Sequence, residues 1–335
     1  MKKALKVTFG TMLAMSMIGQ VNAQFIPQDP ENFIAVWVEG TYTKPSNNGL
    51  SVGDLLFANP NLFDGGHRHT FLSPDNQWDY ALGFSYRLPC QNTRLFFHYD
   101  HYDADDSKGD IDIRNLSFAP PPQTQEVATI NEHSNEFRFG AIHDLHFGDY
   151  FSLDLLAFLE YDKLRLTLNE TISQAGIIGA RETENKVRGF GPGVGFMTRW
   201  YAHNPHWHIF AGATTAILAA DNDYHQTFLT STVPPGFYNY DPEGSDSLVG
   251  KLDINFGINY RCAFRHYFCG AIWDISLGMR YMNIFNAIKN GNTAYNPNAL
   301  DDAGIPINFS PNLGFPQDWG RWGPFLKFKI GGKHS

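Results

Sequence analysis

Two segments of the chain alternate large apolar residues with small or polar ones at every second position. Between residues 78 and 88 the large apolar residues are Trp78, Tyr80, Leu82, Phe84, Tyr86 and Leu88. The same alternation recurs from Leu252 to Tyr260, where Asp253 lies on the polar parity. A period of two places one parity on each face of a β-strand. The pattern therefore predicts strands with one apolar, largely aromatic face and one polar face.

Composition removes several classes of protein. The 335 residues are 43% hydrophobic and 15% aromatic, which is too apolar for a disordered chain. After the first 25 residues, no run of 18 uncharged apolar residues exists that would span a bilayer as a helix. The net charge of -9 also makes nucleic acid an unexpected partner. These observations favour an all-β protein.

The N-terminus has the pattern of a secretory signal peptide. Lys2 and Lys3 precede an apolar stretch over residues 7–18, and Ala23 provides a small residue for cleavage. An amphipathic helix of a cytosolic protein is the alternative, but no acidic residue occurs before Asp29. We expect cleavage after Ala23 and export of residues 24–335 as a single domain.

Ten segments have strand-like patterns, and the connections between them alternate in length. The segments are 33–42, 78–88, 94–102, 135–145, 151–162, 189–200, 207–218, 252–260, 271–283 and 321–330. Short turns alternate with long polar connections over residues 43–77, 103–134, 163–188, 219–247 and 284–320. Outer-membrane barrels have short periplasmic turns and long extracellular loops. The sequence predicts an antiparallel, up-and-down transmembrane β-barrel of about ten strands, with eight or twelve left open.

Four segments resemble a known family. These are residues 78–89, the Gly-Phe-Gly-Pro-Gly-Val-Gly run at 189–195, the strand at 252–260, and Gly278-Met279-Arg280-Tyr281. They resemble the Legionella-type major outer membrane protein family of pore-forming barrels. The resemblance implies a porin in the cell outer membrane that is often oligomeric, has cysteines capable of linking chains, and in some members contacts host surfaces.

If the apolar face of each strand contacts lipid, the polar residues at the alternate positions face the lumen. The predicted pore-lining residues are Asp79, Arg87, Arg94, His98, Glu136, Arg138, Asp154, Glu160, Lys251, Asp253, Arg261, Asp274, Arg280 and Lys327. About ten strands leave at most a narrow conduit, so we expect passive passage of ions or small polar solutes. Charges that pair across the lumen and plug it are one alternative. An adhesin or structural barrel that binds a host or envelope partner through its loops is another.

The three cysteines fall at the short-turn end of this topology. Cys262 and Cys269 would form a disulfide if they flank a tight hairpin, which leaves Cys90 for an interchain bond. The alternative is that all three are small apolar residues.

No pattern in the sequence predicts catalysis, a metal or a cofactor. Acid and base residues occur at Asp144-Leu145-His146 and Asp110-Ile111-Asp112, the residue classes of the omptin proteases, but the predicted topology places them at opposite ends. The acidic stretch from Asp103 fails the calcium-loop motif, with Gly109 and Arg114 at the wrong positions. The histidines at 67, 69, 203, 206 and 208 lack paired cysteines. We therefore expect no enzyme.

Overall fold

The structure is a computed structural model, and it consists of β-strands. It describes residues 34–45, 51–52, 70–71, 76–89, 92–108, 125–174, 177–201, 206–230, 236–240, 245–263, 271–288, 291–295, 309–313 and 317–332. The predicted signal peptide lies outside these residues. In the part of the chain that the structure describes, no helix is long and apolar enough to cross a membrane.

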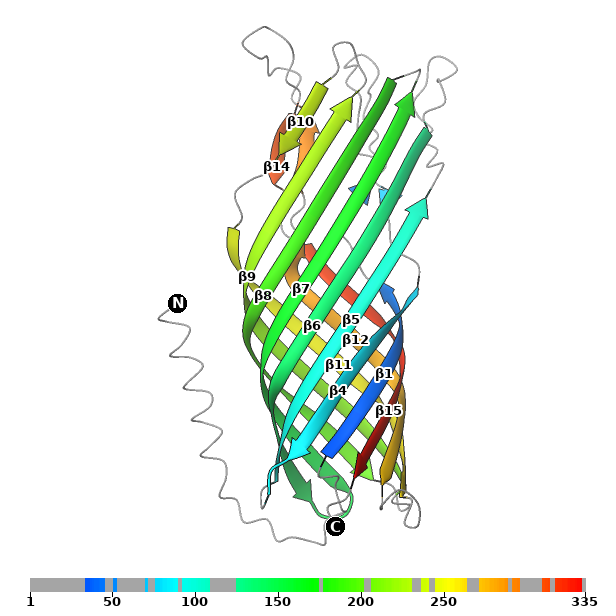
Figure 1. Cartoon of the computed structure of the whole chain (residues 1–335), viewed down its shortest axis with the longest axis vertical. Coiled ribbons are helices and arrows are strands. Elements are labelled where there is room, and N and C mark those ends of the chain that lie inside the picture. The colour runs from blue at the N-terminus through cyan, green and yellow to red at the C-terminus, as the bar shows by residue number, and fades with distance from the viewer. Residues whose placement is uncertain are drawn as a thin grey trace.

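Ten antiparallel strands form one closed sheet (Figure 1). They are β1 (Ile34–Pro45), β4 (Gln77–Arg87), β5 (Thr93–Lys108), β6 (Gln125–Phe147), β7 (Phe151–Gln174), β8 (Ile177–Tyr201), β9 (Trp207–Thr230), β11 (Ser245–Ala263), β12 (Ile272–Ile288) and β15 (Gln317–Gly332). Each strand pairs with its neighbours in chain order, and β1 closes the barrel against β15 with Val38 opposite Phe328. The predicted up-and-down barrel of ten strands is confirmed.

Five short strands lie outside this closed ring. β10 (Gly236–Tyr240) extends the sheet by pairing with the last residues of β9. β2 (Ser51–Val52) pairs with β3 (Thr70–Phe71), and β13 (Gly291–Tyr295) pairs with β14 (Phe309–Leu313).

The two ends of the barrel differ. At one end β1 begins, β15 ends, and β6 turns tightly into β7 through Gly148, whose positive φ of 66° suits a residue without a Cβ. We call this the short-turn end. At the opposite end, called the far end, β6 to β9 extend well beyond their neighbours (Figure 1).

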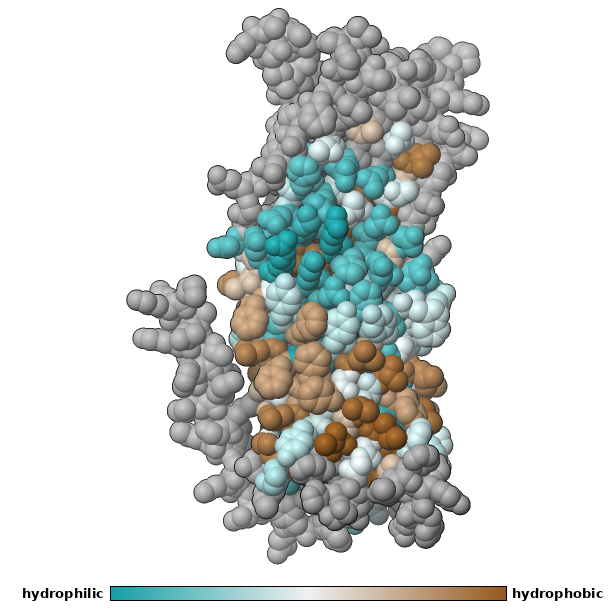
Figure 2. Space-filling model, in the orientation of Figure 1, coloured by the Kyte–Doolittle hydropathy of each residue, from teal (hydrophilic) through white to brown (hydrophobic). Residues whose placement is uncertain are grey.

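Outward-facing side chains form an apolar belt around the short-turn half of the barrel. On β4 the outward residues Trp78, Leu82 and Phe84 are exposed, whereas Asp79 and Ser85 on the other parity are buried. Figure 2 shows this apolar belt as a brown band, with a hydrophilic outer wall, in teal, above it. Exposed apolar side chains around a closed sheet are what a barrel needs in contact with lipid.

Several strands are longer at the far end than the sequence predicts, so the predicted bounds of these strands are wrong there. Residues 163–174 and 177–188 were expected in a long connection, yet they continue β7 and β8 as a paired hairpin. Here the alternation is inverted: Leu164 and Leu166 point inward and are buried, while Arg165 points outward and is exposed. A search for strands with an apolar outer face misses such segments because their apolar residues face the lumen.

Pro192 interrupts β8 on one side only. The pairing with β7 continues through Leu159 opposite Pro192, but the register with β9 passes from Phe190 directly to Gly193. A proline has no backbone N–H to donate, so this gap is its expected consequence.

Candidate functional site

Lys251 lies at the centre of three carboxylates inside the barrel. Its Nζ is 2.6 Å from Glu136 Oε2, 2.6 Å from Glu160 Oε1 and 2.8 Å from Asp162 Oδ2. The lysine comes from β11 and its partners come from β6 and β7, so the contact crosses the lumen. The Lys251 side chain is 2% exposed. Charges this deeply buried are kept only when they are paired and hydrogen-bonded.

Arginines and aspartates extend this cluster to the other wall. Arg138 Nη2 donates to Asp253 Oδ2 over 3.1 Å, and Arg280 Nη2 reaches the same oxygen at 2.8 Å. Asp100 accepts from both Arg280 and Arg321. Arg321 Nη1 also donates to Asp79 Oδ2 at 2.5 Å.

Together these side chains form a charged layer across the lumen. We define the charged layer as Asp79, Asp100, Glu136, Arg138, Glu160, Asp162, Lys251, Asp253, Arg280 and Arg321. Every member is buried, and members from facing walls are joined by ion pairs. The layer therefore narrows the lumen with paired charges of both signs.

A cavity of about 230 Å³ lies between the charged layer and the short-turn end. Its walls include the aromatic side chains of Trp37, Phe96, Phe158, Phe210 and Phe325. A second set of ion pairs lines its other side, where Arg94 Nη2 is 2.6 Å from Asp144 Oδ1 and 3.0 Å from Asp154 Oδ2. A cavity of this size, with charged side chains among its aromatic walls, has room for on the order of ten water molecules.

Beyond the charged layer, toward the far end, the lumen is filled by apolar side chains. The apolar layer comprises Tyr102, Leu164, Leu166, Val187, Leu218, Met282, Ile284 and Trp319, all of them buried. Strand parity explains the order: on β12 the buried residues Arg280, Met282 and Ile284 follow one another at every second position. The guanidinium of Arg321 lies 5.0 Å from the centroid of the Tyr102 ring and links the two layers.

None of the fourteen predicted pore-lining residues is exposed. Seven of them, among them Glu136, Lys251 and Arg280, lie in the charged layer. Five others form ion pairs near the short-turn end: Arg87 with Asp144 at 2.8 Å, Arg94 with Asp154, and Arg261 with Asp274 at 2.8 Å. Asp154 also forms an ion pair with Arg199, and Lys327 forms one with Glu39 at 3.3 Å.

Several members of these clusters are absent from the predicted pore-lining residues. Asp162, Arg321, Arg199 and Glu39 face inward on the parity of residues that were identified, for example Asp162 two residues after Glu160. All four lie within the predicted strand segments, so applying the inward parity to every residue of each segment, including Asp162 at the end of 151–162, would have found them. Trp37 and Phe96 were missed for another reason, because aromatic residues were assigned to the outer face.

Several predicted features are not tested by the structure. Cys90 and Cys269 lie outside the described residues, and Cys262, at the short-turn end of β11, is a free and half-buried cysteine among those described. Asp110 and Asp112 also lie outside the described residues. The adhesin alternative depends largely on connections that lie outside them too.

The closed sheet, apolar belt and charged interior define an outer-membrane β-barrel. The sequence profile of the family described as Legionella pneumophila major outer membrane protein precursor matches residues 29–332, which is nearly the whole chain. The chain belongs to this family, and it is a protein of the outer membrane. The resemblance and the localisation expected from the sequence are confirmed. No curated protein sequence matches the chain.

Several solved structures are similar to the barrel. The outer membrane protease OmpT from Escherichia coli is 12% identical with a TM-score of 0.38, over 92% of this chain and 98% of that chain. The monoaromatic hydrocarbon channel TodX, as a deltaS2S3 mutant, is 8% identical with a TM-score of 0.31 over 92% and 91%. A Pseudomonas aeruginosa FadL homologue is 8% identical with a TM-score of 0.26 over 91% and 94%.

The comparison with OmpT corrects the prediction that the chain is not an enzyme. A protease is among the barrels that align with 92% of this chain. A fold does not by itself determine whether a protein is an enzyme. The separation of two acid–base motifs in the predicted topology was too narrow a reason for that exclusion. At a TM-score of 0.38 the likeness assigns no activity to this chain.

Proposed function

We propose that the protein is a narrow, porin-like pore that passes ions and small polar solutes across the outer membrane. The observation that carries this proposal is the cavity of about 230 Å³ inside the lumen, with ionised side chains at both ends. A barrel that only anchored loops would gain nothing from a polar interior, because burying charges costs free energy. Paired charges at the two ends of the cavity suit a path for small hydrated solutes.

The charged layer is the constriction of this proposed pore. Its ion pairs bridge facing walls, so a solute passes only as these pairs exchange partners or solvent. Arg138 and Arg280 share Asp253, and each has a second carboxylate within reach: Arg138 is 2.5 Å from Glu136, and Arg280 is 3.6 Å from Glu39. The apolar layer restricts the same path toward the far end. We therefore expect a small conductance with frequent closures.

Single-channel recording tests the proposal. The mature chain from residue 24 onward would be refolded, inserted into a planar bilayer and recorded in a salt gradient. Asp253→Asn removes a negative charge from the constriction and should shift the reversal potential toward anion permeability. Arg280→Gln removes a positive charge and should shift it toward cations.

The matched control is Lys186→Gln, because Lys186 lies on the outer wall of β8, where it pairs with Glu184 at 2.7 Å. This variant should leave the reversal potential unchanged. Heat-dependent gel mobility confirms that each variant is a folded barrel. A folded wild-type barrel that never conducts, or shifts of the same sign in both lumenal variants, would refute the proposed pore. The first result would favour the adhesin alternative.

A further inference from the structure

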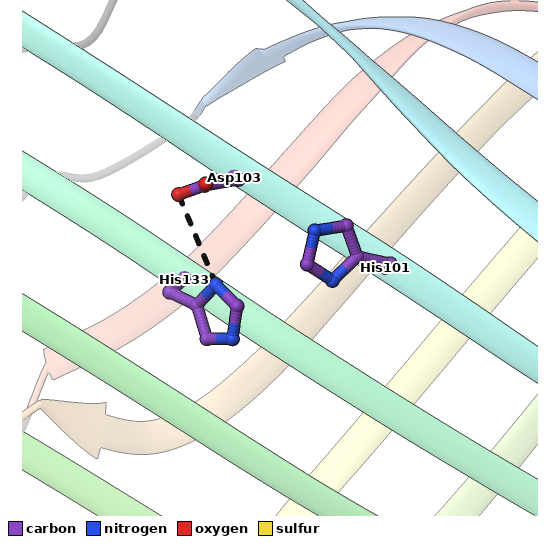
Figure 3. Close-up of side chains that lie close together, drawn as sticks. All are labelled: His101, Asp103 and His133. Carbon is purple, nitrogen blue, oxygen red and sulfur yellow. Dashed lines mark ion pairs between the residues drawn. The ribbon is translucent and has the colours of Figure 1, made fainter.

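Three potential metal ligands meet on the outer wall, away from the lumen. His101 and Asp103 lie on β5, and His133 lies on β6 (Figure 3). The register places Asp103 directly opposite His133 and His101 opposite Asn135. Because alternate residues share one face of a strand, these four side chains form a square on the same surface. We propose that His101, Asp103 and His133 bind one divalent transition-metal ion of the Zn²⁺ class.

The geometry fits an ion between the side chains. One ligand atom from each of the three residues lies within 4.8 Å of the others. His133 Nδ1 and Asp103 Oδ1 are 3.8 Å apart, which is too long for a direct hydrogen bond. Ligands about 2.0–2.2 Å from a tetrahedral ion are roughly 3.3–3.6 Å apart, so a small side-chain rotation completes the arrangement. The Asp103 side chain, 71% exposed, is free to make it.

Asn135 contacts both imidazole rings and orients His101 for metal binding. Its Oδ1 is 2.9 Å from His101 Nδ1, and its Nδ2 is 2.7 Å from His133 Nε2. The amide oxygen accepts from a protonated His101 Nδ1, which leaves Nε2 of that ring unprotonated for the ion, whereas the contact between Nδ2 and His133 Nε2 must loosen when His133 Nδ1 binds the ion. The Tyr99 hydroxyl donates to the same Oδ1 at 2.8 Å and fixes the amide in turn. Histidines that ligate metals typically donate from the second ring nitrogen to an acceptor, and Asn135 Oδ1 provides this acceptor for His101.

The donor set selects the kind of ion. Two imidazole nitrogens and one carboxylate suit Zn²⁺ and its neighbours, whereas Ca²⁺ and Mg²⁺ prefer oxygen ligands. Three protein ligands leave at least one position open to water or an external ligand. Arg165 on β7 lies opposite His133 and forms an ion pair with Glu184 at 2.5 Å. This pairing limits the repulsion between Arg165 and the bound ion.

A second group of carboxylates, in the charged layer, does not qualify. Glu136, Glu160 and Asp162 also have ligand atoms within 4.8 Å of one another. The Lys251 amine already occupies their centre, with all three contacts at 2.6–2.8 Å. The outer-wall cluster contains no such internal cation.

Calorimetric titration of the refolded full barrel with Zn²⁺ tests the site. The wild type should bind one more equivalent than the His101→Ala/His133→Ala double variant. Asn135→Ala, which removes the orienting amide, should weaken that equivalent by about 10- to 100-fold without abolishing it. His225→Ala is the matched control, because His225 lies on β9, away from this cluster, and should titrate like the wild type.

Co²⁺ provides a spectroscopic readout that depends on coordination. The wild type should develop visible absorption bands on addition of Co²⁺, and the double variant should not. Gel mobility with and without heating establishes that each variant is folded, and His101→Gln/His133→Gln replaces the alanine variant if it is not. Equal Zn²⁺ stoichiometry and affinity in the wild type and the double variant would overturn the proposal.

Discussion

Glu132 is a buried acid at the far-end side of the charged layer. It lies on β6 between the outward-facing polar residues Asn131 and His133, and it is 0% exposed. Its Oε2 accepts hydrogen bonds from Trp319 Nε1 at 3.1 Å and from the Tyr102 hydroxyl at 3.4 Å. Burial raises the pKa of Glu132 from 4.5 to about 7, and these hydrogen bonds only partly oppose the effect.

This raised pKa predicts that acid stabilises the barrel. Between about pH 4.5 and pH 7, folded Glu132 holds a proton that the unfolded chain has lost. The free energy of unfolding should fall as the pH rises through this window, by up to about 3 kcal/mol, and level off above it. Glu132→Gln keeps an acceptor for Trp319 but cannot ionise, so it should lose this contribution to the pH dependence.

Urea unfolding in lipid vesicles, followed by tryptophan fluorescence across this pH range, measures the difference. Glu182→Gln is the control, because Glu182 is exposed on the outer wall of β8 and the charge change is the same. The prediction fails if wild type and Glu132→Gln show parallel stability curves from pH 4.5 to pH 8.

At the scale of the element, β6 belongs to two environments. Toward the short-turn end its outward residues are apolar, and Phe139 is 56% exposed within the belt. Toward the far end its outward residues are polar, and Asn131 is exposed. The inward residues change in the opposite sense, from the charged Glu136 and Arg138 to Ile130. One continuous strand therefore crosses from lipid into water.

A pair of substitutions on β6 tests this boundary. Phe139→Arg places a charge in the belt and should lower the free energy of unfolding from vesicles by about 2–4 kcal/mol. Asn131→Arg places the same charge eight residues away on the same face and should cost less than about 1 kcal/mol. Urea titration of both variants in one lipid decides the matter. Equal losses would show that the belt does not end between these residues.

The predictability of each element follows from this division. β4 is close to its predicted bounds because its whole length lies in the belt, where apolar residues face outward without interruption. The extensions of β7 and β8 were taken for loops because their outward residues are polar and their apolar residues are inside. The lumenal charges followed from parity. Pairing partners such as Lys251 and Glu136, 115 residues apart, depend on closure and register, which no local pattern contains.

At the scale of the whole molecule, the closed barrel arranges side chains by height. From the short-turn end the lumen contains ion pairs, the cavity, the charged layer and then the apolar layer. The outer wall has the apolar belt and, beyond it, the His101 cluster, where Tyr80 and His101 have ring centroids 4.9 Å apart. That cluster arises from cross-strand register, so the spacing of histidines along the chain gave no sign of it.

The same arrangement by height bears on how barrels are linked to one another. Cys262 is half-buried at the short-turn end; along the sequence, Cys90 follows β4 and Cys269 lies between β11 and β12, and both are outside the described residues. Neighbouring barrels inserted in one orientation bring their short-turn ends to the same side of the membrane.

We expect a non-reducing gel of outer membranes to show dimers or larger species that reductant removes. Cys90→Ser should abolish these species, whereas Cys262→Ser/Cys269→Ser should retain them, because the latter two are expected to pair within one chain. Identical ladders with and without reductant would contradict an interchain disulfide.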